Sequence, residues 1–154
     1  MMKADDPRFE KARQEAIERV KRVDEMMVTV LKNHLVVEQL MDEFLVASGK
    51  KADGKFSDKI DRCKGLRPPE FTEKEWAVLT KANQLRNKIG HTLDQAEIKA
   101  KMDEVRAAYL AALSDEQRPH SEKLDDVRIA AAAFEHCGAY MVAATETARA
   151  GKKS

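Results

Sequence analysis

The stretch DEMMVTVLKNHLVVEQLMDEFLVAS, residues 24–48, decides the fold class of this chain. Its apolar residues recur every three or four positions over several turns, which is the spacing of an amphipathic α-helix. The stripe consists of Met27, Leu31, His34, Glu38, Met41 and Leu45, with Val30, Val37 and Phe44 beside it. Gly49, directly after Ser48, suits the end of a helix. The stretch therefore predicts a long core helix from about Asp24 to Ser48 that carries two polar residues, His34 and Glu38, on its inner face.

A second clear helix begins at Thr72, where a hydroxyl followed three residues later by Glu75 forms the pattern of a capping box. Its inner stripe consists of Trp76, Leu79, Asn83 and Arg86, with Leu85 and Ile89 beside it. Glycine adopts the left-handed conformation that commonly ends a helix. We therefore expect this helix to end at Gly90.

The remaining segments also follow helical patterns. Asp6 and Pro7 predict a helix start, and this first helix extends to about Val23 and either bends or continues there. The segment 50–67 is the most basic stretch of the chain, and its apolar residues predict a short helix that ends at Gly65. Two further helices are expected from about 94 to 113 and from about 122 to 148, with a turn at 114–121 between them.

The composition supports an all-α protein. The chain has 154 residues, of which 43% are hydrophobic, 36% are charged and only 5% are aromatic. Alanine, leucine, glutamate, lysine and arginine are common while glycine and proline are few, which favours helix. We expect one domain over residues 1–150, built as a bundle of about four to five main helices, and a disordered tail at 151–154.

Charge and motif content exclude several classes of protein. A net charge of +1 argues against a general nucleic-acid coat protein but leaves room for a local basic patch. No apolar run approaches the roughly 20 residues of a membrane span, and the first residues lack the apolar core of a signal peptide. A cytoplasmic protein without a membrane partner is expected. Because the sequence has no phosphate-binding loop, no dinucleotide-binding glycine pattern and no metal-ligand spacing, we expect neither a cofactor nor a metal.

Arg86 is the most unusual residue on a predicted inner face. A guanidinium stays protonated, and a buried charge without a partner is very costly. The only nearby acid on another inner stripe is Glu38. We therefore expect an ion pair between Glu38 and Arg86, with Asn83 and His34 completing the hydrogen bonds. The alternative is that these residues form a purely structural polar cluster.

His91 follows Arg86 by five positions. In an unbroken helix the two side chains diverge by roughly 140°, so they can share a site only if Gly90 turns the chain back. Histidine titrates near neutral pH and can move protons, while arginine can bind phosphate oxygens through two hydrogen bonds. In such a site Asn87 would orient the histidine or the phosphate, and Lys88 would add attraction for the substrate.

The segment Arg86-Asn87-Lys88-Ile89-Gly90-His91 resembles the motif of the HEPN superfamily, in which an arginine and a polar residue precede a histidine. The resemblance extends over about residues 23–113. It includes Asn33-His34-Leu35-Val36-Val37-Glu38 on the long helix, Phe56-Ser57-Asp58-Lys59-Ile60, and Trp76 with Leu79 and Asn83-Gln84-Leu85-Arg86-Asn87, as in standalone bacterial HEPN proteins.

The resemblance implies a helical homodimer whose two motifs meet across a cleft. Active HEPN proteins are metal-independent endoribonucleases, in which the RNA 2′-hydroxyl attacks and a 2′,3′-cyclic phosphate remains. Many act as toxins or in phage defence, often beside a nucleotidyltransferase antitoxin. By this resemblance Arg86, Asn87 and His91 are the expected catalytic residues, and RNA is the expected substrate.

Two alternatives to an enzyme remain open at this point. Other HEPN proteins have lost catalysis and serve as modules that bind RNA or a partner protein. A helical transcriptional co-regulator resembling the mannitol repressor family has a similar helical outline. RNA cleavage in EDTA separates the enzyme from both alternatives.

Overall fold

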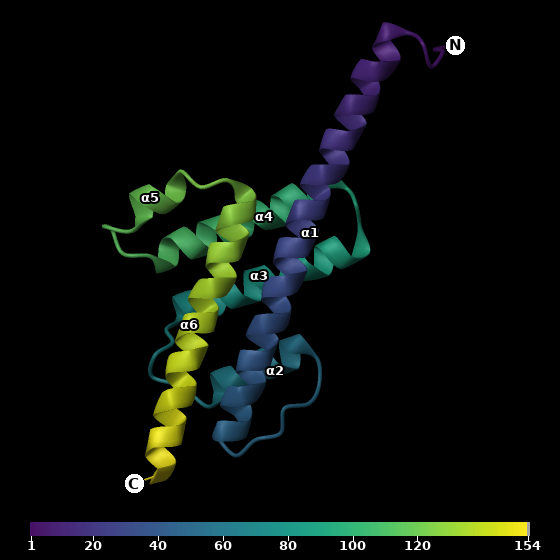
Figure 1. The fold of residues 1–154 in the computed structure, drawn as a ribbon. Coiled ribbons are helices and arrows are strands. Elements are labelled where there is room, and N and C mark those ends of the chain that lie inside the picture. Colours follow the sequence, from purple (N-terminus) through teal and green to yellow (C-terminus); the bar gives the residue numbers. More distant parts are fainter. Residues whose placement is uncertain (154) are drawn as a thin grey trace.

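The computed structural model describes residues 1–153, and this part of the chain forms six α-helices and no strand (Figure 1). The helices are α1 (Pro7–Ala47), α2 (Phe56–Gly65), α3 (Glu73–His91), α4 (Gln95–Ala112), α5 (Arg118–Glu122) and α6 (Asp126–Lys153). The predicted all-α fold is therefore confirmed. None of the helices in the described chain is both long and apolar enough to cross a membrane.

Helix α1 is one continuous helix of 41 residues, so the two helices expected at 7–23 and 24–48 are joined. Asp6 caps it by accepting a hydrogen bond from the Arg8 backbone, and Pro7 occupies the first turn, where its missing N–H costs nothing. At the other end Gly49 has a φ of 78°, the left-handed geometry that a glycine tolerates best. The N-terminal part of α1 extends beyond the other helices (Figure 1).

The core lies between two pairs of helices. Helices α1 and α6 pack along each other, and α3 packs along α4 behind them (Figure 1). Helix α2 packs against both α1 and α3, which places its first turn beside these two helices. The largest fully buried side chains come from the two pairs: Phe134, Met41, Leu45, Leu79, Leu85, Met102, Ile129 and Met141. The inner face predicted for α4, with Met102 and Val105, is buried as expected.

Three predicted boundaries differ from the structure near the C-terminus and in α3. The segment expected as a turn at 114–121 contains the short helix α5. Helix α6 continues through Lys153, so residues 151–153 are helical where a disordered tail was expected; Ser154 lies outside the described residues. Helix α3 passes through Gly90 and includes His91, so the prediction that Gly90 ends it is wrong. Thr72 does cap α3, and its hydroxyl donates to Glu75 Oε2 at 2.6 Å.

Candidate functional site

Arg86 and His91 do not share a site within one chain. Because α3 is helical through both residues, their side chains diverge by roughly 140° around its axis. His91 is exposed at the last turn, while Arg86 is half-buried and lines a cavity that His91 does not reach. Gly90 therefore does not fold His91 back toward Arg86, and the expectation that it does so is corrected.

The second correction concerns Glu38, which pairs with Lys59 of α2 and not with Arg86. Lys59 Nζ lies 3.5 Å from Glu38 Oε2 and 2.8 Å from Asp42 Oδ1, and the Lys59 side chain is only 8% exposed. Burial lowers the pKa of Lys59, but the attraction of Asp42 and Glu38 outweighs this effect, and the net shift is upward. Lys59 thus forms the ion pair with Glu38 that was expected for Arg86.

Arg86 is left with a guanidinium that forms no hydrogen bond or ion pair within residues 1–153, and its buried Nε atom has no partner there. A side chain at Gly90 would meet the Arg86 Nη1 atom at 3.9 Å, so the guanidinium lies beside this glycine, one turn further along α3. A buried charged donor without an acceptor is costly. In native structures such a group calls for an explanation, such as a catalytic role or a bound water or ion.

The cavity beside Arg86 lies between α1, the first turn of α2 and α3, and has a volume of about 320 Å³. It is lined by His34, Leu35, Glu38, Lys55, Phe56, Ser57, Asn83, Arg86 and Asn87. His34 is 5% exposed, and its Nε2 atom has no hydrogen-bond partner in the described chain. Burial and the neighbouring Arg86 lower the pKa of His34, and Asn83 and Glu38 offset this only in part. The cavity therefore combines an unpaired cation with a neutral, buried imidazole.

The structure brings five of the eight predicted site residues together at this cavity: Arg86, Asn87, Asn83, His34 and Glu38. Lys88 and His91 lie on α3 outside the lining of this cavity. Gly90 is also outside the lining, and it lies beside the Arg86 guanidinium.

The contribution of α2 to the cavity could not be predicted from the sequence, which marked residues 50–67 only as basic. Lys55 and Ser57 line the cavity from the start of this helix, where backbone N–H groups have no partner within the helix and favour an anion. The signal was the basic composition of residues 50–67. That composition alone did not indicate which of its lysines lies beside Arg86.

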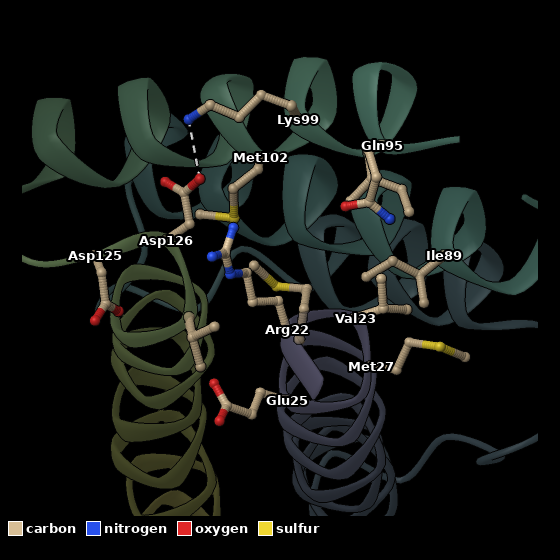
Figure 2. Close-up of a pocket in the computed structure, with 13 residues that line it drawn as sticks. Arg22, Val23, Glu25, Met27, Ile89, Gln95, Lys99, Met102, Asp125 and Asp126 are labelled. Carbon is tan, nitrogen blue, oxygen red and sulfur yellow. Dashed lines mark hydrogen bonds and ion pairs between the residues drawn. The ribbon is translucent and has the colours of Figure 1, made fainter. Parts of the chain in front are cut away.

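A second cavity, of about 270 Å³, lies where α1, the end of α3, α4 and the start of α6 meet (Figure 2). Its walls are mainly apolar, with Met27, Ile89 and Met102 among the lining side chains. At its edge Lys99 pairs with Asp126 at 2.9 Å. Asp126 also accepts a hydrogen bond from Arg106 at 2.8 Å, so its negative charge is compensated. This cavity has fewer polar groups to orient a ligand than the cavity beside Arg86.

No group of three histidine, cysteine, aspartate or glutamate side chains in the described residues is arranged to hold a metal ion. Cys63 and Cys137 are free and buried, and burial raises the pKa of each thiol to about 12. Neither thiol is therefore ionised at neutral pH, which makes both poor nucleophiles. In the cavity beside Arg86, the arginine can bind an anion and His34 can transfer a proton.

Helix α3 carries the segment 86–91, and Arg86 and Asn87 of this segment line the polar cavity. Comparisons with protein-family models, with curated proteins and with solved structures find no match to this chain.

Proposed function

We propose that this protein is a metal-independent endoribonuclease of the HEPN type that acts as a homodimer. The observation that supports the proposal is the Arg86 guanidinium, which lines a polar cavity and has no partner in the described part of the chain. Arginine is the side chain best suited to hold the oxygens of a phosphodiester through paired hydrogen bonds. An endoribonuclease of this kind can act as a toxin that a nucleotidyltransferase antitoxin restrains.

The proposed reaction is an internal transfer at phosphorus. The RNA 2′-hydroxyl loses its proton to a histidine and attacks the adjacent phosphorus. The bond to the 5′-oxygen breaks, a histidine protonates that oxygen, and a 2′,3′-cyclic phosphate and a 5′-hydroxyl remain. Arg86 stabilises the charge on the phosphoryl oxygens, and His91 supplies the acid–base group. Because His91 and Arg86 diverge on one helix, a second copy of the chain must bring its His91 to the phosphate.

Incubation of RNA with the pure protein in EDTA tests this proposal. We expect cleavage that leaves a 2′,3′-cyclic phosphate, with DNA resistant because it lacks the attacking hydroxyl. Arg86→Ala and His91→Ala should each lower the rate by about 10²–10⁴. His120→Ala is the matched control, since His120 is also exposed but lies on α5. Cleavage that survives both motif substitutions overturns the proposal.

The dimer is tested by mixing the two inactive variants. If each active site takes Arg86 from one chain and His91 from another, a mixture of Arg86→Ala and His91→Ala chains restores one complete site per heterodimer. We expect partial recovery of cleavage after the two chains are exchanged. A strictly monomeric protein by light scattering contradicts this arrangement.

The divergence of Arg86 and His91 favours a second candidate function, a module that binds RNA without cutting it. Such a module needs only the Arg86 cavity. RNA binding that depends on Arg86, without cleavage under any condition, supports this second function over the first.

A further inference from the structure

Two buried nitrogen atoms without hydrogen-bond partners belong to one cavity. They are Nε of Arg86, from α3, and Nε2 of His34, from α1, and neither has an acceptor within the described residues. His34 is among the most buried polar residues, at 5% exposure, and its ring packs against Phe56 with centroids 4.0 Å apart. The arginine nitrogen is always a donor, and the histidine nitrogen becomes one when it carries a proton. The two residues together therefore call for an acceptor in the cavity.

The charges around the cavity favour an acceptor that is negative. Arg86 and Lys55 are cationic, and the start of α2 contributes the partial positive charge of a helix N-terminus, which Asp58 in its first turn offsets in part. The one carboxylate in the lining, Glu38, is held by Lys59 at 3.5 Å. Lys59 is shared with Asp42, so Glu38 is compensated only in part and remains the one repulsive group in the lining.

The cavity is large enough for a phosphate group and some water. Its volume is about 320 Å³, and a water molecule takes roughly 30 Å³ in the liquid. Asn83, which is 8% exposed, lies in the same wall and offers an amide donor. A tetrahedral oxyanion can accept hydrogen bonds from all three side chains because its four oxygens point in different directions.

We propose that this cavity binds one tetrahedral oxyanion, the phosphate group of a nucleotide or of RNA, and that His34 is a ligand of this anion together with Arg86 and Asn83. The proposal goes beyond RNA cleavage, because it assigns the site to a histidine outside the Arg86–His91 motif and holds whether or not the protein cuts RNA. The imidazole at this site comes from α1, and His91 has no part in it.

The proposal has a consequence for pH. The groups near His34 are Arg86 and Asn83 on α3, Glu38 on its own helix, and Lys55 and Lys59 on α2; α6 adds the uncharged Phe134 ring, 6.2 Å away. In the free protein burial and Arg86 lower the pKa of His34. A bound anion stabilises the protonated ring and raises this pKa, so by linkage the anion binds more tightly as the pH falls.

Sulfate is the probe, because it remains a dianion between about pH 5 and pH 8 while phosphate itself titrates. Histidine resonances of the full chain are followed by NMR during sulfate titrations across this range. The His34 resonance is assigned by replacing the other three histidines, His91, His120 and His136, one at a time. We expect sulfate to raise the pKa of His34 and to bind about tenfold more tightly at the acidic end of the range. Unchanged titration of His34 in saturating sulfate overturns the proposal.

Variants separate the cavity from the motif. Arg86→Met should weaken sulfate binding by about tenfold to a hundredfold, and His34→Gln should remove its pH dependence. His91→Gln is the matched control and should bind sulfate as the wild type does. Equal weakening by His91→Gln and Arg86→Met contradicts the assignment. If His34→Gln does not fold, as judged by circular dichroism, the wild-type titration alone decides.

The source of the phosphate is tested by competition. Adenosine 5′-monophosphate carries a phosphomonoester, whereas the dinucleotide ApA carries only a phosphodiester. Displacement of sulfate by the monophosphate alone assigns the cavity to a terminal phosphate, and displacement by both assigns it to any RNA phosphate. Failure of both to displace sulfate contradicts the proposal. A protein that binds sulfate through His34 but never cuts RNA refutes the proposed nuclease and leaves this site intact.

Discussion

The apolar cavity in Figure 2 and the polar cavity beside Arg86 differ in which buried polar atoms lack a hydrogen-bond partner. The walls of the cavity in Figure 2 are mainly apolar, with Met102 among them, and one of the acids in its lining, Asp126, is compensated by Lys99 and Arg106. The cavity beside Arg86 contains a guanidinium and an imidazole, and one buried nitrogen of each, Nε of Arg86 and Nε2 of His34, has no partner in residues 1–153. Burial of apolar side chains contributes to stability, whereas buried polar groups without hydrogen-bond partners lower stability and indicate a ligand. What distinguishes the two cavities is therefore buried polar nitrogens without a partner, which only the cavity beside Arg86 contains among the described residues.

The largest expected effect is on the free energy of unfolding, at a side chain that lines the apolar cavity. Met102 is 1% exposed, and Met102→Ala should lower the free energy of unfolding by about 3 kcal/mol, because it removes buried contacts and enlarges the cavity. Leu35→Ala is the control, since Leu35 lines the polar cavity but is 65% exposed, and it should cost less than about 0.5 kcal/mol. Chemical denaturation measures both variants. Similar losses for the two substitutions would remove the distinction between the cavities.

The next effect concerns Lys59, which holds the acids beside the polar cavity. Lys59→Met leaves Glu38 and Asp42, one turn apart on α1, without their shared cation, and should cost about 2 kcal/mol because both carboxylates keep some solvent. Lys64→Met is the control, because its pair with Glu73 is exposed and should contribute less than about 1 kcal/mol. The raised pKa of Lys59 means that the wild type keeps this contribution below about pH 10 and loses it as the pH rises further. Thermal melts at neutral and alkaline pH measure it.

A smaller effect compares one arginine from each region. Arg86→Met should leave stability unchanged or raise it by up to about 1 kcal/mol, because the substitution removes a charge that has no partner in the described structure. Arg106→Met should instead lower it by about 1–2 kcal/mol, since Arg106 donates to Leu124 O at 2.9 Å and to Asp126 at 2.8 Å. A clear loss of stability in Arg86→Met would show that the polar cavity is a structural cluster.

The smallest expected effect tests the geometry of α3. Gly90→Ala should raise the free energy of unfolding by about 0.5 kcal/mol, because glycine is unfavourable inside a helix and the added methyl meets only the Arg86 Nη1 atom, at 3.9 Å. A left-handed Gly90 would make the same substitution destabilising. Denaturant midpoints, with Gly65→Ala at the end of α2 as the comparison, distinguish the two geometries.

Much of the fold could be predicted from spacing alone. The buried faces of α1 and α4 follow their apolar periodicity, and the caps at Asp6 and Thr72 lie where side-chain chemistry places them. Gly90 misled the prediction because a glycine near a helix end fits both a left-handed terminator and one more helical residue. The choice between them depends on the chain that follows, where Thr92 caps the helix and donates its N–H to Lys88 O.

The candidate site, like the fold, could be predicted from the sequence only in part. Periodicity placed Arg86, Asn83, His34 and Glu38 on inner faces, and these four residues do line one cavity. The partner of Glu38 could not be predicted, because Lys59 reaches it from a segment that sequence marked only as basic.

By itself, the sequence determined that this protein is helical, which faces of its helices are buried, and that an arginine and a histidine lie on those faces, because these properties follow from local spacing and composition. Only the tertiary structure decided which charges meet. Because α2 docks on α1, Lys59 pairs with Glu38, and Arg86 is without a partner in the described chain. His34 lies in the cavity that Arg86 lines. The physical reason is that ion pairing acts over a few ångströms in space, a distance that separation along the chain does not encode.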